Sequence, residues 1–167
     1  MKYKRIFIFG GTASGKTTLA EKLSTKFKIP YYSIDDFIYK KGWKLKYTDN
    51  QRDKKLKQFS SKKKWIIEGV QRGDWILPAV KKADFIIILS LPKYILLTRI
   101  LTRELKRRFQ KHPKKSDLRD TLTLIKYAYI YKHDNFIHHQ RLTKEHNKEF
   151  VILESKKQIN KFVEELK

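Results

Sequence analysis

The sequence predicts an α/β fold of three layers, in which helices cover both faces of one parallel sheet. Apolar runs typical of buried strands alternate along the chain with segments of helical periodicity. The run at 83–91 is almost continuously Ile, Phe and Leu, as expected for a strand that is covered on both faces. A glycine-rich loop at 10–15 joins the first apolar run to the first helical segment. Together these observations favour a single domain over residues 1–167.

The elements can be placed in order, and the sequence shows no linker or internal repeat between them. Strands are expected at 5–9, 31–34, 65–69, 83–91 and 149–153. Helices are expected at 16–28, 50–62, 92–109 and 117–142, with a short one near 74–80 and a last one after Ser155. Asp49 and Asp74 are expected N-caps, and Ser155 with Gln158 forms an expected capping box.

Composition limits the class of protein. The 167 residues include 40% hydrophobic residues and no cysteine, so the chain has material for a core but cannot form a disulfide or a thiolate metal site. The first five residues are too polar for a signal peptide, and the apolar run at 85–91 is too short to span a membrane. We therefore expect a cytoplasmic protein without a membrane segment.

The chain is strongly basic, with a formal net charge of +23. Such a charge attracts polyanions and speeds encounters with them. The lysines are dispersed over every predicted helix, which is typical of a solvated surface that accepts small phosphate-bearing substrates. Specific nucleic-acid binding is the alternative, but no nucleic-acid-reading motif is recognisable. Non-specific binding to nucleic acid is expected under either interpretation.

The loop carries the strongest motif of the sequence. Residues 10–17 match the pattern G-x-x-x-x-G-K-[ST], and they lie between a predicted strand and a predicted helix, as the motif requires. Inward-facing N–H groups and the start of the helix would form an anion site, because both present partial positive charge. Lys16 would reach the β- and γ-phosphates, and the Thr17 hydroxyl would ligate Mg²⁺. The expected nucleotide-binding residues are Gly10, Gly11, Thr12, Ala13, Ser14, Gly15, Lys16, Thr17 and Thr18.

Further motifs resemble those of a known family. After the loop come Ile29-Pro30 followed by Asp35, the pair Gly42-Trp43, the strand Trp65-Ile66-Ile67-Glu68-Gly69, and Leu91-Pro92 before an arginine-rich helix. In combination they resemble the adenylate-kinase-like P-loop kinases. Within that group the chain is most similar to the small bacterial proteins called DNA topology modulation protein or adenylate-kinase-related ATPase. The resemblance covers nearly the whole chain.

The resemblance implies a P-loop NTPase fold with a five-stranded parallel sheet, which we expect in the order 2-3-1-4-5, and a helical lid at about 99–135. It also implies an enzyme that uses ATP and Mg²⁺ to phosphorylate a small acceptor. Glu68 occupies the position of an acid that holds Mg²⁺ through water, although this family more often has Asp there. Arg99 and Arg103, four residues apart on one helix, would act with Lys16 on the transferred phosphoryl group.

Two residues are expected on the acceptor side. Asp35 would orient the acceptor or serve as a base, with Asp36 as the adjacent alternative. Arg72 matches the arginine that holds the acceptor's phosphate in adenylate kinases, so a nucleoside monophosphate is the first candidate acceptor. Simpler explanations remain open: a helix cap for Asp35, an exposed surface arginine for Arg72, a solvated strand-end acid for Glu68, and a solvated helix face for Arg99 and Arg103.

Other features leave the function open. The long helix at 117–142 carries Tyr127, Tyr129, Tyr131 and Lys132, which would complete the lid or, for the tyrosines, pack in the core. The five histidines lack the spacing of a metal pair. An ATP-dependent, DNA-associated regulatory protein with weak or no kinase activity is the alternative function. The sequence determines neither the acceptor nor the oligomeric state.

Overall fold

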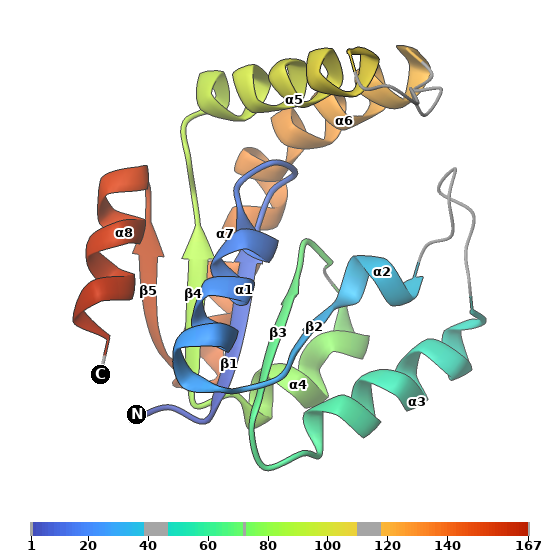
Figure 1. Cartoon of the computed structure of the whole chain (residues 1–167). Coiled ribbons are helices and arrows are strands. Elements are labelled where there is room, and N and C mark those ends of the chain that lie inside the picture. Colours follow the sequence, from blue (N-terminus) through green and yellow to red (C-terminus); the bar gives the residue numbers. More distant parts are fainter. Residues whose placement is uncertain (1, 39–46, 72, 110–117, 167) are drawn as a thin grey trace.

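The computed structural model describes residues 2–38, 47–71, 73–109 and 118–166, apart from a few side chains within them. Its centre is a parallel sheet in the order β2-β3-β1-β4-β5, which confirms the predicted order (Figure 1). The register pairs Phe7 of β1 with Ile67 of β3 on one side and with Ile86 of β4 on the other. The strands are β1 (Arg5–Gly10), β2 (Tyr31–Ser33), β3 (Trp65–Gly69), β4 (Phe85–Leu89) and β5 (Glu149–Leu153).

Helices cover both faces of the sheet, so the predicted three-layer fold is confirmed. On one face lie α1 (Lys16–Phe27) and α8 (Lys156–Glu165). On the other face lie α3 (Asp49–Ser60), α4 (Leu77–Lys82) and α7 (Phe136–Glu145), as Figure 1 shows. The remaining elements are α2 (Ile34–Ile38), the 3₁₀-helix η1 (Asp74–Ile76), α5 (Lys93–Arg108), α6 (Leu118–Ile130) and the π-helical segment η2 (Tyr131–Asn135).

The two sides of the central strand explain why the core has two halves. Side chains alternate along β1, so Phe7 and Phe9 join the core under α3, α4 and α7, whereas Ile6 and Ile8 join the core under α1 and α8. All four side chains are fully buried. A strand covered on both faces needs a continuous apolar sequence, which is the pattern that predicted a parallel sheet.

Helices α5 and α6 pack against each other across the carboxyl ends of the strands, at the top of Figure 1. Their small core contains Leu96, Ile100 and Ala128. Leu101 and Leu105 are 50% and 56% exposed. The sequence of α5 contains two adjacent apolar stripes, and periodicity alone cannot tell which of them faces the partner helix.

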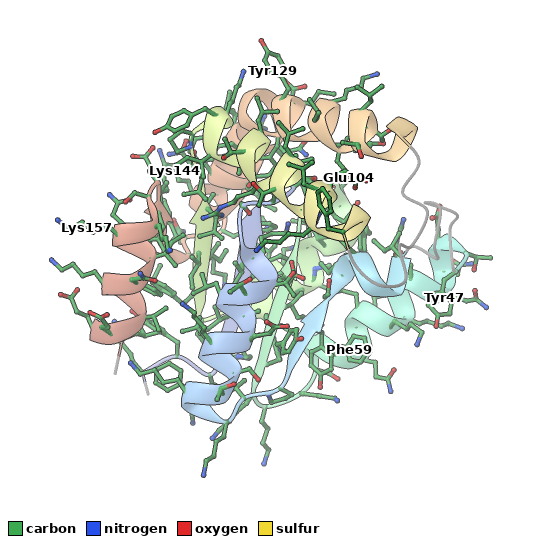
Figure 2. All side chains as sticks on the ribbon, turned by 45° about the horizontal axis from the view of Figure 1, so that its top comes forward. Tyr47, Phe59, Glu104, Tyr129, Lys144 and Lys157 are labelled. Atoms are coloured by element: carbon green, nitrogen blue, oxygen red, sulfur yellow. The ribbon has the colours of Figure 1, made fainter. Side chains whose placement is uncertain are left out.

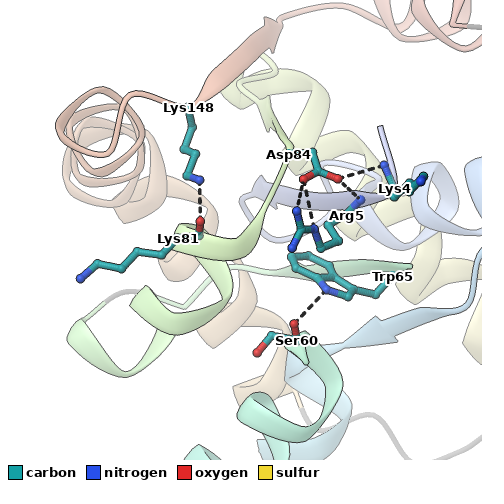
Figure 3. Close-up of polar contacts among 7 residues, drawn as sticks. All are labelled: Lys4, Arg5, Ser60, Trp65, Lys81, Asp84 and Lys148. Carbon is teal, nitrogen blue, oxygen red and sulfur yellow. Dashed lines mark hydrogen bonds and ion pairs between the residues drawn. The ribbon is translucent and has the colours of Figure 1, made fainter. Parts of the chain in front are cut away.

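At the amino-terminal ends of the strands, polar contacts hold neighbouring segments together (Figure 3). The Asp84 carboxylate accepts hydrogen bonds from the backbone N–H groups of Lys4 and Arg5 and from the Arg5 guanidinium. Partial burial alone would raise the pKa of Asp84, but these donors outweigh it and lower the pKa. The Trp65 indole N–H donates to the Ser60 carbonyl, which joins β3 to the end of α3. The polar residues at this end of the sheet therefore stabilise the fold.

Three local predictions need correction. Thr48, not Asp49, caps α3, because its hydroxyl accepts the Gln51 N–H while the Gln51 side chain returns to the Thr48 N–H. The N-cap position of η1 is occupied by Gly73, not by Asp74, which is the first residue of η1. The long helix predicted at 117–142 is instead α6, η2 and α7, which run on to Glu145 with a π-helical segment between them. The capping box of Ser155 and Gln158 at α8 is confirmed.

The surface of the described residues agrees with a dispersed basic charge. Lysines on different helices, such as Lys144 on α7 and Lys157 on α8, project away from the body of the protein (Figure 2). None of the described helices combines the length and the apolar character that crossing a membrane requires.

Candidate nucleotide-binding site

The glycine-rich loop connects β1 to α1 at the carboxyl edge of the sheet. Its backbone turns sharply, with positive φ angles at Ala13 (61°) and Gly15 (96°) and a hydrogen bond from the Ser14 N–H to the Gly11 carbonyl. The Lys16 ammonium lies back along the loop and donates to the same carbonyl at 3.1 Å. No side chain caps the N-terminus of α1. The first N–H groups of the helix therefore remain directed at the space where an anion would bind.

Two glycines of the loop are required by close packing. A Cβ at Gly10 would lie 2.5 Å from the Ser14 hydroxyl oxygen, and one at Gly11 would lie 2.8 Å from the ring of Tyr131. Real Cβ contacts are not that short, so neither position accepts a side chain without a shift of its neighbours. The Ser14 hydroxyl is itself buried without a hydrogen-bond partner. Such an orphan group in a phosphate-binding loop is consistent with a ligand as its missing partner.

Glu68 is the last but one residue of β3, beside the loop, and it is 1% exposed. One carboxylate oxygen accepts the Thr17 hydroxyl at 3.0 Å, and the other has no partner. Burial raises the pKa of Glu68, although nearby Lys16 and the hydrogen bond from Thr17 oppose the shift. A buried, half-satisfied carboxylate next to a threonine hydroxyl offers the oxygen ligands that a hard divalent cation prefers. The residues present therefore fit the implied Mg²⁺.

Within the described residues no cluster of three His, Cys, Asp or Glu side chains could hold a metal by itself. Thr17 and Glu68 would supply only part of the coordination shell. This matches the usual behaviour of Mg²⁺, which is bound through one or two protein groups together with waters and substrate phosphates. The donor set at Thr17 and Glu68 is therefore suited to a metal that arrives with a nucleotide.

Helix α5 crosses above the loop and directs Arg99 down onto it. The Arg99 guanidinium donates to the carbonyls of Ala13 and Ser14 at 3.1 and 2.9 Å. Arg103 lies one helical turn further on and is exposed. These hydrogen bonds tie Arg99 to the loop, so the alternative of a purely solvated helix face does not hold for this residue.

A cavity of about 680 Å³ brings most of the predicted site together. Its walls come from the loop and from five helices, α1, α2, α5, α6 and α8. Asp35 of α2 lies at one side, and Lys156 and Asn160 of α8 line another. Sequence reasoning missed these two α8 residues, since nothing in their local pattern distinguishes them from other surface residues. The predicted residues that line it are Thr12, Ala13, Ser14, Gly15, Lys16, Thr17, Thr18, Asp35, Arg99 and Arg103.

Asp35 is the second residue of α2, so it is not that helix's N-cap. Its carboxylate accepts a hydrogen bond from the side-chain amide of Gln71 at 3.3 Å, and its charge contributes to the raised pKa of Glu68. Gln71 was not among the predicted site residues. Arg72 and the pair Gly42-Trp43 lie outside the described residues, so the role predicted for Arg72 stays a prediction.

The tyrosines predicted on the long helix divide into two groups. Tyr131 is 2% exposed and packs against the loop at Gly11, which agrees with the core alternative. Tyr127 and Tyr129 are 50% and 63% exposed. Tyr129 lies on the outer side of α6 (Figure 2), where the Lys93 ammonium sits 3.5 Å from the centre of its ring.

The parallel sheet and the loop together define a P-loop NTPase domain. A family model described as an AAA domain matches residues 6–119, and the chain belongs to this family. A search of curated proteins found no significant match to the sequence.

Among solved structures, the fold is similar to several shikimate kinases. The enzyme from Bacteroides thetaiotaomicron has a TM-score of 0.61 at 15% identity, over 98% of this chain and 96% of that one. The enzyme from Acinetobacter baumannii, in complex with shikimate, has a TM-score of 0.61 at 15% identity, over 98% and 90%. The enzyme from Aquifex aeolicus has a TM-score of 0.54 at 16% identity, over 97% and 92%. At these identities the likeness shows a shared fold.

Proposed function

We propose that this protein is a phosphotransferase that moves the γ-phosphoryl group of ATP to a small acceptor. The observation that carries the proposal is the cavity in which the loop, Arg99, Arg103 and Asp35 meet. A phosphate-binding loop alone would fit a switch or a motor equally well. An arginine-bearing helix above the loop and a carboxylate across the cavity are what transfer to a second substrate requires. The similar fold of shikimate kinases supports the same conclusion.

The donor side follows from the loop. Its N–H groups and Lys16 would hold the β- and γ-phosphates, while Arg99 and Arg103 would neutralise charge on the transferred group. When bound at Thr17 and Glu68, Mg²⁺ would further polarise the phosphate oxygens. In the reaction an acceptor oxygen forms a bond to the γ-phosphorus, the bond to the bridging oxygen breaks, and ADP leaves with that electron pair. Catalysis is then mainly positioning and charge neutralisation.

The acceptor side involves Asp35 and Arg72. Asp35 would orient the attacking oxygen and accept its proton if the acceptor is an alcohol. A nucleoside monophosphate remains the first candidate, on the strength of Arg72. The shikimate complex of a similarly folded kinase makes a small hydroxyl-bearing acid the second candidate. Both candidates are anionic, which suits a chain of net charge +23.

The test uses ATP labelled at the γ position with a panel of nucleoside monophosphates, nucleosides and small hydroxy acids. We expect labelled product with one class of acceptor and none with the variant Lys16→Ala, which controls for contaminating kinases. If no acceptor is labelled although ATP binds, the proposal is wrong.

The alternative is an ATP-dependent, DNA-associated regulator, which the resemblance to the topology modulation proteins and the charge of +23 favour. Attraction to polyanions weakens steeply as salt is raised, whereas specific recognition adds contacts that persist. DNA binding measured at low and at physiological salt separates the two. Sequence-dependent binding that survives physiological salt would support the regulator.

A further inference from the structure

A histidine on α7 is fully buried beneath the site although the phosphotransfer scheme does not use it. His139 has no exposed surface, and its ring stacks on Phe9 of β1 with 3.9 Å between ring centres. Both ring nitrogens have polar partners. Nε2 lies 2.8 Å from the backbone carbonyl oxygen of Gln71, and Nδ1 lies 3.3 Å from the hydroxyl of Tyr131. Two polar partners in an otherwise apolar core indicate a specific role for the ring.

The partners determine the tautomer of this histidine. A carbonyl oxygen can only accept, so Nε2 of His139 carries the proton and donates to Gln71. In the neutral ring Nδ1 is then the acceptor, and the Tyr131 hydroxyl donates to it. Burial raises the pKa of Tyr131, so the hydroxyl keeps the proton that this bond needs. The ring thus fixes two segments that are distant in sequence, one on each side.

Each of these segments reaches the candidate site. On one side, the ring of Tyr131 packs so closely on Gly11 that no Cβ fits between them. On the other side, Gln71 uses its side-chain amide to bind the carboxylate of Asp35 at 3.3 Å. The hydrogen-bonded chain from Tyr131 through His139 and Gln71 therefore ends at the acceptor side, and it begins against the phosphate loop. Tyr131 also starts the π-helical segment η2, a type of irregularity that is frequent at functional sites.

We propose that His139 is a positioning residue. It holds Gln71, and through Gln71 also Asp35, at a fixed position relative to the phosphate loop. This inference rests on the proposed function, because the position of Asp35 relative to the phosphate loop matters only if a phosphoryl group passes between two substrates. Phosphoryl transfer depends on the alignment of the two substrates, and a displacement of about 1 Å can cost about 100-fold in rate. The ring acts on the reaction only through Gln71 and Tyr131.

The test compares three variants of the full chain. His139→Leu removes both hydrogen bonds, whereas His139→Gln can keep a donor for the Gln71 carbonyl. Thr143→Val is the matched control, because Thr143 is also fully buried on α7 and its hydroxyl donates to the backbone carbonyl of His139 instead of Gln71. The measurements are kcat and KM for the acceptor, the Kd for ATP, and amide NMR signals of Asp35 and Gln71.

We expect His139→Leu to lower kcat/KM for the acceptor by about 10- to 100-fold, while the Kd for ATP changes by no more than about twofold. His139→Gln should recover most of the loss, and Thr143→Val should keep near-normal kinetics even if it unfolds at a lower temperature. The NMR signals of Asp35 and Gln71 should move in His139→Leu and stay in place in Thr143→Val.

Two results would overturn the proposal. One is an equal loss of kcat/KM in His139→Leu and Thr143→Val, which would make the effect one of stability. The other is unchanged NMR signals of Asp35 and Gln71 in His139→Leu. If the wild-type protein phosphorylates no acceptor, the proposed function fails, and the NMR comparison alone then decides whether His139 positions Asp35.

Discussion

Replacing Glu68 with glutamine should stabilise the fold while it weakens the binding of magnesium-bound ATP. The wild-type side chain is 1% exposed, and one of its oxygens has no partner. Burial therefore penalises the carboxylate and raises its pKa, as far as Lys16 and its hydrogen bonds allow. Glutamine has almost the same shape, and its carbonyl can still accept the Thr17 hydroxyl. The variant thus removes the charge and puts an amide group in place of one carboxylate oxygen.

The sign of the pH effect follows from the raised pKa. Between the pKa of the unfolded chain and the higher pKa of the folded protein, folding takes up a proton at Glu68. The free energy of unfolding therefore falls as the pH rises through this window. Above the folded pKa, the ionised Glu68 carboxylate lowers the stability by its full amount. Each unit of displacement corresponds to about 1.4 kcal/mol. The glutamine variant lacks this cost.

We expect a gain on the order of 1 kcal/mol in the free energy of unfolding at neutral pH, which raises Tm by about 2–4 °C for a chain of this size. The gain should disappear below the pKa of the unfolded carboxyl. Calorimetric titration should show magnesium-dependent ATP binding weakened by about tenfold or more. A lower Tm at neutral pH together with unchanged affinity would refute the reasoning.

Three further predictions concern packing, ion pairing and the lid. Gly11→Ala places a methyl group against the Tyr131 ring and should cost about 1–3 kcal/mol in the free energy of unfolding; a Tm equal to that of the wild type would contradict this. Asp84→Asn removes the Arg5 ion pair and should cost about 1–2 kcal/mol at neutral pH in denaturant titrations. Because the folded pKa of Asp84 is lowered, this contribution is present above the unfolded pKa and is lost as the pH falls through the folded pKa, so a cost that persisted at lower pH would be inconsistent. Arg99→Lys cannot reproduce both contacts to the loop and should lower kcat by about tenfold or more in steady-state kinetics, with the exposed Lys106→Ala as the control; full turnover would argue against a role for Arg99.

The fold was predictable because its rules are local. Apolar runs such as that at 85–89 specify covered strands, and the loop between β1 and α1 has a fixed pattern and context. The family resemblance supplied the strand order. At the site, the same local pattern led to Lys16 and Thr17, and the family resemblance led to Glu68.

The remaining parts depend on contacts that no local pattern carries. Gln71 and His139 are 68 positions apart, and only the packing of α7 against the sheet brings them together. The exposed stripe of Leu101 and Leu105 matches the periodicity of a buried face, and tertiary packing decides between it and the stripe of Leu96 and Ile100. The π-helical segment at Tyr131–Asn135 likewise has no sequence signature that the periodicity of the long helix reveals.

The most direct test of the central claim follows the γ-phosphoryl group of ATP by ³¹P NMR in the presence of the acceptor class that the labelling panel selects. The account predicts a new phosphoester or phosphoanhydride signal that grows as ATP is consumed, exceeds the signal of inorganic phosphate, and is absent with Lys16→Ala. ATP consumption that yields only inorganic phosphate, at a rate that no acceptor changes, would contradict it and identify an ATPase.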